Sequence, residues 1–244
     1  MQRLVLLGTG TCQLEVQRKA SSVLVELEGL RILYDLGRGI ADRLVEVGSR
    51  QDDLEHIVLS HFHPDHLSDL IPYLHAACWS QVDPRSRDLH IHGPVGLRVQ
   101  MMRLLSLFGP DTLQRHDRFQ IHLHEHRGEV LNLGGRTFQW VDLPPADNHG
   151  LRFEVGGKVY VLTGDAGFGD PLVKCLTGVD VAVIDSGHST DAEIVELAVR
   201  SGAQRILCSH LYRPIDGPGL TAEARGRGYA GVIDVAEDLE VLEL

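Results

Sequence analysis

The segment HIVLSHFHPDH (residues 56–66) places four polar side chains directly behind a short apolar strand. Alternate side chains of an extended segment share one face, so His61 and His63 can converge on one point. As the chain turns into the next element, Asp65 and His66 point toward a second point nearby. Imidazole nitrogens and a carboxylate are ligands suited to zinc, manganese or iron. The spacing therefore predicts a metal site and disfavours the alternative, an exposed loop that is merely rich in histidine.

The apolar pattern on either side of this motif predicts two groups of strands, each interspersed with helices. Short apolar runs between turn signals predict strands, with a hairpin at 151–163 and a last strand pair at 231–235 and 239–242. Apolar residues spaced three or four apart predict helices at 40–47, 67–79, 95–108 and 191–201. This order predicts an α/β protein with two sheets packed face to face and helices outside, and disfavours a continuous βαβ winding.

The bulk composition bounds the class of protein. With 244 residues, 43% of them hydrophobic, and no linker, repeat or low-complexity segment, we expect a single domain over residues 1–244. No run of about 18 apolar residues is present, and the N-terminal apolar run is too short for a signal peptide. The four cysteines form no CxxC pair, which disfavours a cysteine zinc site or a disulfide framework. We expect a cytoplasmic protein with no membrane partner.

The motif at 61–66 resembles the HxHxDH signature of the metallo-β-lactamase superfamily, and the resemblance covers nearly the whole chain. The segments LLGTGTC, RKASSVLVE and ILYDLGRG are similar to the N-terminal strands of its ribonuclease-Z-like and phosphodiesterase branch. The resemblance implies a four-layered αββα sandwich with the metals at one edge of the sheets.

The same resemblance implies further ligands. The segment LTGDAG is similar to the family's GDT motif, which makes Asp165 the carboxylate that bridges both metals, and ILCSH is similar to the C-terminal ligand motif, which indicates His210. The implied cofactors are two divalent metal ions, zinc in first place and manganese or iron as alternatives. The implied ligands are His61, His63, Asp65, His66, His149, Asp165 and His210.

His149 enters this set because the chain departs from the family pattern. The family supplies another histidine to the first metal, and alignment on GLRFE puts that position near Pro144 or Pro145. His149 is the histidine at hand if the loop contains a short gap. The alternatives are that His149 lies behind the ligands or contacts substrate, and that the first metal is weakly held or absent.

Two residues are implied to act in catalysis. The segment DSGHSTDAEIVELA resembles the family's GHST-type loop, in which a histidine assists the leaving group, so His188 is expected as general acid with support from Asp185. The alternative for His188 is a hydrogen-bonding role in the loop. Asp65 is expected to bind a metal and also to orient the proton of the nucleophile.

Five more histidines suggest another metal site at first sight. His122, His124 and His126 alternate along one predicted strand and so share a face, and His90 and His92 alternate along another. We favour a solvated strand face over a further metal site.

The resemblance implies a hydrolase in which two metals activate water for attack on phosphorus or a carbonyl carbon. A net charge of −11 disfavours large nucleic acid, and only a short hairpin occupies the interval in which ribonuclease Z proteins carry their arm for transfer RNA. A small or nucleotide-derived phosphodiester is the first choice of substrate. A carbonyl ester, lactone or thioester is the alternative, as is a non-catalytic binding protein with a degenerate metal site. A homodimer is compatible with each of these functions.

Overall fold

The computed structural model describes residues 2–144 and 147–244, and these fall into two compact units. The first unit comprises Met1–Gly8, Lys19–His126 and Leu239–Glu243, and the second comprises Thr9–Arg18 and Arg127–Asp238 with the last residue. Each unit contains one seven-stranded sheet with helices. The expected α/β class is therefore confirmed.

The sheet of the first unit has the order β14-β1-β2-β3-β4-β5-β6. Neighbours from β14 to β3 are antiparallel, and those from β3 to β6 are parallel. The strands are β1 (Arg3–Gly8), β2 (Ser22–Leu27), β3 (Leu30–Tyr34), β4 (His56–Val58), β5 (Leu89–Pro94), β6 (Ile121–His126) and β14 (Glu240–Glu243). The helices are α1 (Ile40–Glu46), η1 (Gln51–Asp53), α2 (Pro64–Leu67), α3 (Leu70–Trp79), α4 (Leu97–Phe108) and α5 (Pro110–Leu113).

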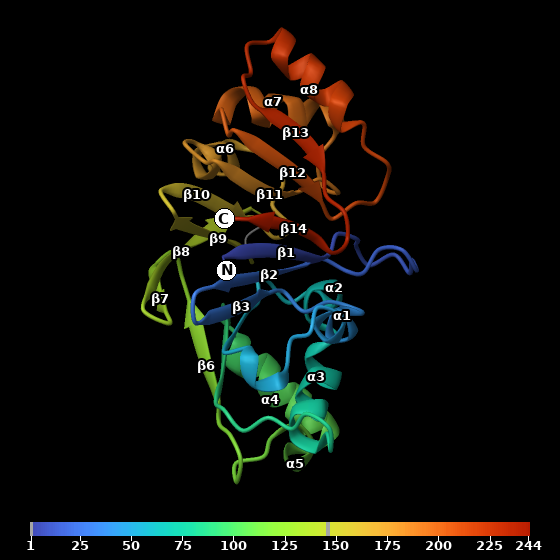
Figure 1. The fold of residues 1–244 in the computed structure, drawn as a ribbon, viewed down its shortest axis with the longest axis vertical. Helices are drawn as coiled ribbons and strands as arrows, with labels where there is room; N and C mark the ends of the chain where they lie inside the picture. Colours follow the sequence, from blue (N-terminus) through green and yellow to red (C-terminus); the bar gives the residue numbers. More distant parts are fainter. Residues whose placement is uncertain (1, 145–146) are drawn as a thin grey trace. The chain divides into compact units, whose positions relative to one another are not determined.

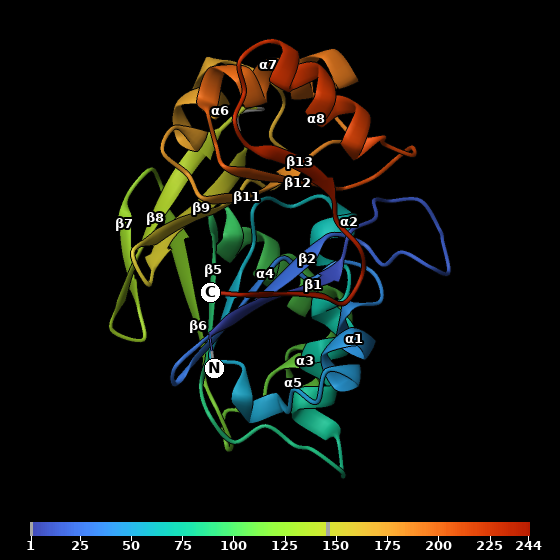
Figure 2. The ribbon, with the colours of Figure 1, turned by 45° about the horizontal axis from the view of Figure 1, so that its top comes forward.

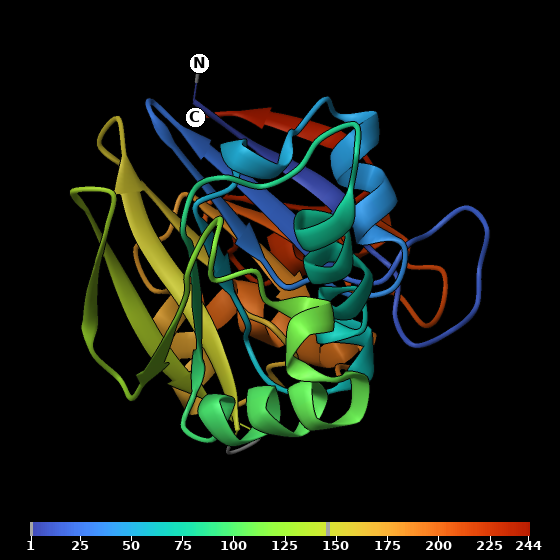
Figure 3. The same cartoon turned by 90° about the horizontal axis from the view of Figure 1, so that it is seen from below.

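The helices of this unit cover one face of its sheet (Figure 3). Ile57 and Ile91 point from the central strands into a buried cluster with Leu44 of α1, Leu74 of α3 and Met101 of α4. Burying an aliphatic side chain of this size stabilises the folded state by about 1.5–3 kcal/mol. The core thus packs against one face of β4, the strand that precedes the HxHxDH motif. Side chains that alternate with these core residues along the strands, such as His56 and His92, lie on the other face of the sheet.

The sheet of the second unit has the order β13-β12-β11-β10-β9-β8-β7, with β10 to β13 parallel and β7 to β10 antiparallel. Its helices α6, α7 and α8 gather on one face of the sheet (Figures 1 and 2). The strands are β7 (Val130–Leu133), β8 (Arg136–Leu143), β9 (Asn148–Val155), β10 (Lys158–Leu162), β11 (Val181–Asp185), β12 (Arg205–Ser209) and β13 (Val232–Val235). The helices are α6 (Asp170–Leu176), α7 (Asp191–Ser201) and α8 (Gly217–Gly226).

The structure confirms most of the expected elements and corrects one pairing. The hairpin is β9 paired with β10 around Gly156 and Gly157. The two last strands do not pair with each other: β13 pairs with β12, whereas β14 pairs with β1. An apolar pattern identifies a strand but not its partner, and this strand pair was therefore wrongly predicted. All four cysteines are free, as expected. Among the described residues, no helix combines the length and apolar character that a membrane span requires.

Candidate metal centre

The structure brings three rings of the HxHxDH motif together. His61 follows β4 and is 4% exposed, His63 is the N-cap residue of α2, and His66 ends the first turn of α2 and is fully buried. The ring centroid of His61 lies 4.4 Å from that of His63 and 4.3 Å from that of His66. Asp65 lies in the same short helix and is partly buried. The rings of His61 and His63 thus lie side by side, as their spacing predicts, and His66, expected at a second point, lies equally close to His61.

Asp35 orients two of these rings. Its carboxylate accepts hydrogen bonds from the Ser60 backbone N–H (2.7 Å), from Ser60 Oγ (2.8 Å) and from Nδ1 of His66 (2.8 Å). Since the Ser60 hydroxyl gives its proton to Asp35, the Ser60 oxygen can only accept from Nδ1 of His61, which lies 2.9 Å away. Both imidazoles therefore carry their proton on Nδ1 and present the lone pair of Nε2, the arrangement that metal-binding histidines have.

The loop after β3 has a backbone conformation that places Asp35 beside Ser60 and His66. Asp35 has a φ of 62°, in the left-handed region that Asp tolerates better than most residues. At Gly37 a Cβ would lie 1.9 Å from the carbonyl oxygen of Asp65, so only glycine fits there. The Leu36 N–H donates to the carbonyl of His66 at 2.8 Å. The ILYDLGRG segment was recognised in the sequence as a family feature, but the role of Asp35 was missed. A carboxylate directly after a buried strand was the available indication.

A second cluster lies wholly within the second unit. Asp165, Asp185, His188 and His210 offer ligand atoms that all lie within 4.8 Å of one another. Asp165 follows β10, Asp185 ends β11 and His210 follows β12, so three adjacent parallel strands deliver them at their carboxyl ends. His210 Nε2 lies 3.4 Å from Asp165 Oδ1, and its Nδ1 lies 3.2 Å from Asp185 Oδ1. The two residues implied by GDT-like and C-terminal motifs are therefore neighbours.

Asn148 holds the turn that carries Asp165. Its side chain donates to the carbonyl of Thr163 (3.0 Å) and accepts from the backbone N–H of Asp165 (2.9 Å), and the residue is 1% exposed. The Thr163 hydroxyl in turn accepts from the backbone N–H of Asp185 at 3.1 Å. Sequence reasoning missed Asn148, because a buried asparagine beside a histidine has no distinctive spacing.

His188 is oriented by Asp185, as expected. Its Nδ1 lies 2.6 Å from Asp185 Oδ2, much closer than the 3.9 Å to Asp165 Oδ2. This hydrogen bond raises the pKa of His188 above its ordinary value. The ring is 47% exposed, so its other nitrogen is accessible to a bound substrate. A Cβ on Gly187 would lie 2.5 Å from the carbonyl oxygen of His210, and glycine lets this loop approach the end of β12.

His149 does not belong to that four-residue cluster. It lies on β9, is 7% exposed, and packs with its ring 5.0 Å from that of Trp140. Its Nδ1 lies 2.9 Å from Asp142 Oδ1, so it has the carboxylate partner that ligand histidines commonly have. The family position falls near Pro144 or Pro145, and Pro145 lies outside the described residues. A ligand role for His149 stays a prediction.

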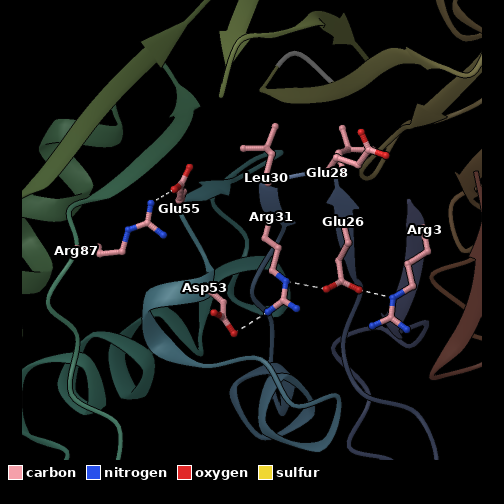
Figure 4. A pocket seen from close by; sticks show the side chains of 10 residues that line it. Arg3, Glu26, Glu28, Leu30, Arg31, Asp53, Glu55 and Arg87 are labelled. Atoms are coloured by element: carbon pink, nitrogen blue, oxygen red, sulfur yellow. Dashed lines mark hydrogen bonds and ion pairs between the residues drawn. The ribbon is translucent and has the colours of Figure 1, made fainter. Parts of the chain in front are cut away.

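A charged cavity of about 390 Å³ in the first unit has a different character (Figure 4). Glu26 is paired with both Arg3 and Arg31, Arg31 also with Asp53, and Glu55 with Arg87. Three arginines thus neutralise three of the four acidic residues on its walls, and the fourth acidic residue is Glu28. Glu55 precedes β4 whereas His61 follows it, so this cavity lies at the opposite end of that strand from the histidine motif.

The chain matches the family model described as the metallo-beta-lactamase superfamily over residues 17–210. It belongs to the metallo-β-lactamase superfamily. Ribonuclease Z of Mycobacterium bovis (strain BCG / Pasteur 1173P2) is 28% identical over 280 residues, which cover 100% of this chain and 99% of the relative. Ribonuclease Z of Streptococcus pneumoniae (strain CGSP14) is 25% identical, with 84% of this chain and 87% of the relative covered.

Solved structures of the superfamily share the fold over the full length. The metallo-β-lactamase fold protein YhfI from Bacillus subtilis aligns with a TM-score of 0.79 at 20% identity, with 100% of both chains covered. The short form of human tRNase Z aligns with a TM-score of 0.71 at 21% identity, covering 99% of this chain and 98% of the other. A diphosphatase of the PhnP family aligns with a TM-score of 0.73 at 20% identity, covering 100% of this chain and 98% of the other. The chain is a metal-dependent hydrolase of this superfamily.

Proposed function

We propose that this protein hydrolyses phosphodiester bonds with two divalent metal ions, of which zinc is the first candidate. The observation that carries the proposal is the ordered donor set, in which buried histidines present Nε2 because Asp35 and Ser60 fix their tautomers. The proposed ligands are His61, His63, Asp65, His66, Asp165 and His210, with His149 as the candidate for the remaining position.

The donor chemistry fits this cofactor. Neutral imidazole and carboxylate are the ligands of zinc, manganese and iron, whereas magnesium and calcium favour all-oxygen sites. The oriented Nδ1–H groups of His61 and His66 leave their Nε2 atoms as the ligand nitrogens. When bound, two such ions would bring the pKa of a water to about 7 and polarise the scissile group.

The side chains of the chain supply the proton transfers. We propose that Asp65 binds a metal and orients the proton of the attacking group. His188, held through Nδ1 by Asp185, donates a proton from Nε2 to the departing alkoxide. The raised pKa of His188 keeps more of it protonated near neutral pH, as a general acid requires.

The proposed substrate is a small or nucleotide-derived phosphodiester. The alignment with the mycobacterial ribonuclease Z extends over 280 residues against the 244 of this chain, so that relative has segments that this chain lacks. Between the strands β9 and β10 of this chain there is only the short turn at Gly156 and Gly157. A net charge of −11 further disfavours a long phosphate backbone as the ligand.

The test uses metal-free protein reloaded with zinc, manganese or iron. Bis(p-nitrophenyl) phosphate, a cyclic nucleotide, an aliphatic lactone and a transfer-RNA precursor are offered in parallel. Metal-dependent cleavage of the small phosphodiesters, with two metal equivalents bound, supports the proposal. Turnover of the lactone alone moves the chain to the carbonyl-ester class. Efficient cleavage of the transfer-RNA precursor contradicts the assignment of a small substrate. A protein that binds no metal and turns over none of these substrates contradicts the proposed two-metal hydrolysis.

A further inference from the structure

The most unusual feature outside the candidate metal centre is a set of histidines on three parallel strands of the first unit. We call it the histidine ladder. In register, His56 of β4 faces His90 of β5, which faces His122 of β6, and His92 faces His124. Neighbouring rings stack, with centroids 4.5–5.3 Å apart, and His126 continues the row on β6. The ladder consists of His56, His90, His92, His122, His124 and His126.

Diagonal hydrogen bonds of one pattern join the ladder. His90 Nδ1 lies 3.0 Å from His124 Nε2, His92 Nδ1 lies 2.9 Å from His126 Nε2, and His56 Nδ1 lies 3.0 Å from His92 Nε2. His56 and His92 are buried, whereas the others are partly exposed. The three histidines of β6 are partly exposed on one strand face, as expected, and their rings are in addition linked to those of β5. In each of these bonds at least one of the two rings must be neutral, because the accepting nitrogen carries no proton.

The distance within one pair has a consequence for metal binding. With metal–nitrogen bonds of about 2.0–2.1 Å, two nitrogens 3.0 Å apart subtend roughly 90–100° at a shared ion. A tetrahedral ion would require an angle of about 109° and a separation near 3.3 Å. An angle near 90° is the one that square-planar or tetragonal copper(II) and nickel(II) prefer with nitrogen ligands.

We propose that His90 Nδ1 and His124 Nε2 form a binding site for nickel(II) or copper(II), separate from the candidate metal centre. This pair is chosen because both rings are partly exposed, whereas His92 is 4% exposed and closed to an incoming ion. Water completes the coordination. On binding, the proton between the two nitrogens moves to the far nitrogen of its own ring, and both rings turn away from the line that joins the nitrogens so that their lone pairs converge on the ion. Burial lowers the pKa of His90 and of His124, which keeps both rings neutral at pH 7.

The test titrates zinc-replete protein with nickel(II) in an isothermal calorimeter, because prior zinc loading occupies the candidate metal centre. One equivalent of nickel is expected in the wild type. His124→Gln, on the edge strand β6, should lose that equivalent, and so should His90→Gln. Two variants are used because β5 is an inner strand, and a folding defect of His90→Gln leaves His124→Gln to decide. Zinc content and hydrolysis should stay unchanged in both.

His116→Gln is the matched control. His116 is an exposed histidine of the same unit whose Nδ1 contacts Gln120, and it lies outside the ladder. Its nickel equivalent should be that of the wild type. No nickel uptake by the zinc-replete wild type, or the same uptake in His124→Gln as in His116→Gln, overturns the proposal.

Discussion

Replacing Asp35 by asparagine should weaken metal binding without unfolding the protein. The amide oxygen of the introduced asparagine can still accept from the Ser60 backbone N–H, which lies 2.7 Å from the present carboxylate. The amide nitrogen would then face Nδ1 of His66, now 2.8 Å from Asp35 Oδ2. Two donors cannot share that position, so His66 must move its proton to Nε2. This tautomer blocks the nitrogen proposed as the ligand.

The expected magnitude follows from the number of bonds affected. Asparagine tolerates the left-handed φ of 62°, so the backbone of the loop can persist. Loss of a carboxylate that orients a ligand histidine typically lowers metal affinity about 10–100-fold, equivalent to about 1.4–2.7 kcal/mol. Asp35→Ala would remove all three hydrogen bonds, each worth about 1.5–3 kcal/mol to a charged group, and would confuse lost affinity with lost stability.

The assay is competition for zinc with a chromophoric chelator at pH 7.5, beside thermal unfolding of the metal-free proteins. Asp69→Asn is the control, because the Asp69 carboxylate also accepts a backbone N–H, from Ala41 at 3.0 Å, but is not bonded to a motif histidine. Asp35→Asn should lose zinc affinity and Asp69→Asn should not. Equal zinc affinity in both variants would refute the assignment of Asp35 as the orienting group, and so would a loss explained entirely by unfolding.

Four further outcomes are expected. Asp165→Ala should abolish hydrolysis with loss of both metals or of their pairing, and a fully active variant would contradict the two-metal proposal. His188→Ala should slow substrates with poor leaving groups by about 10²–10⁴-fold more than nitrophenyl esters at unchanged metal content, whereas equal slowing would indicate a binding role. His149→Ala should reduce the metal count from two toward one, and unchanged metal with weaker substrate binding would remove it from the ligand set. Burial lowers the pKa of His92 to about 2 and that of His56 to about 4, so the folded state disfavours protonation of both rings. The urea concentration at the midpoint of unfolding should therefore fall as the pH drops below about 6.5, the ordinary pKa of histidine. In His92→Leu this midpoint should depend less on pH.

The sequence predicted the parts of the fold that depend on local pattern. Apolar spacing identified α1, α3, α4 and α7, because each has a buried face that repeats along the helix. It missed α6 and α8, which begin with Gly-Asp-Pro and Asp-Gly-Pro, segments typical of turns. In both helices the proline occupies the first turn, where no intrahelical N–H is needed.

In the candidate site, too, the sequence predicted the residues that belong to a local pattern and missed those that act on distant partners. The motif residues His61 and His66 were identified because their spacing is local and specific. Asp35 and Asn148 were missed because each acts on a partner far away in the chain, at Ser60 and Asp165 respectively. Register between strands brings such pairs together, and no short-range pattern encodes it.

The backbone itself gives an independent indication of where the site lies. Three non-glycine residues among those described have a positive φ: Asp35, His210 and Leu239. A left-handed conformation costs an ordinary L-residue roughly 1–2 kcal/mol, so it persists where other contacts offset it. At Asp35 three hydrogen bonds do so, and after His210 the backbone N–H of Leu211 donates to Thr9 at 3.0 Å. Each of the two directly follows a buried strand, and each contacts other residues proposed for metal binding. Strain that packing and hydrogen bonds maintain at such positions is typical of functional sites, and here it coincides with residues chosen on entirely different grounds.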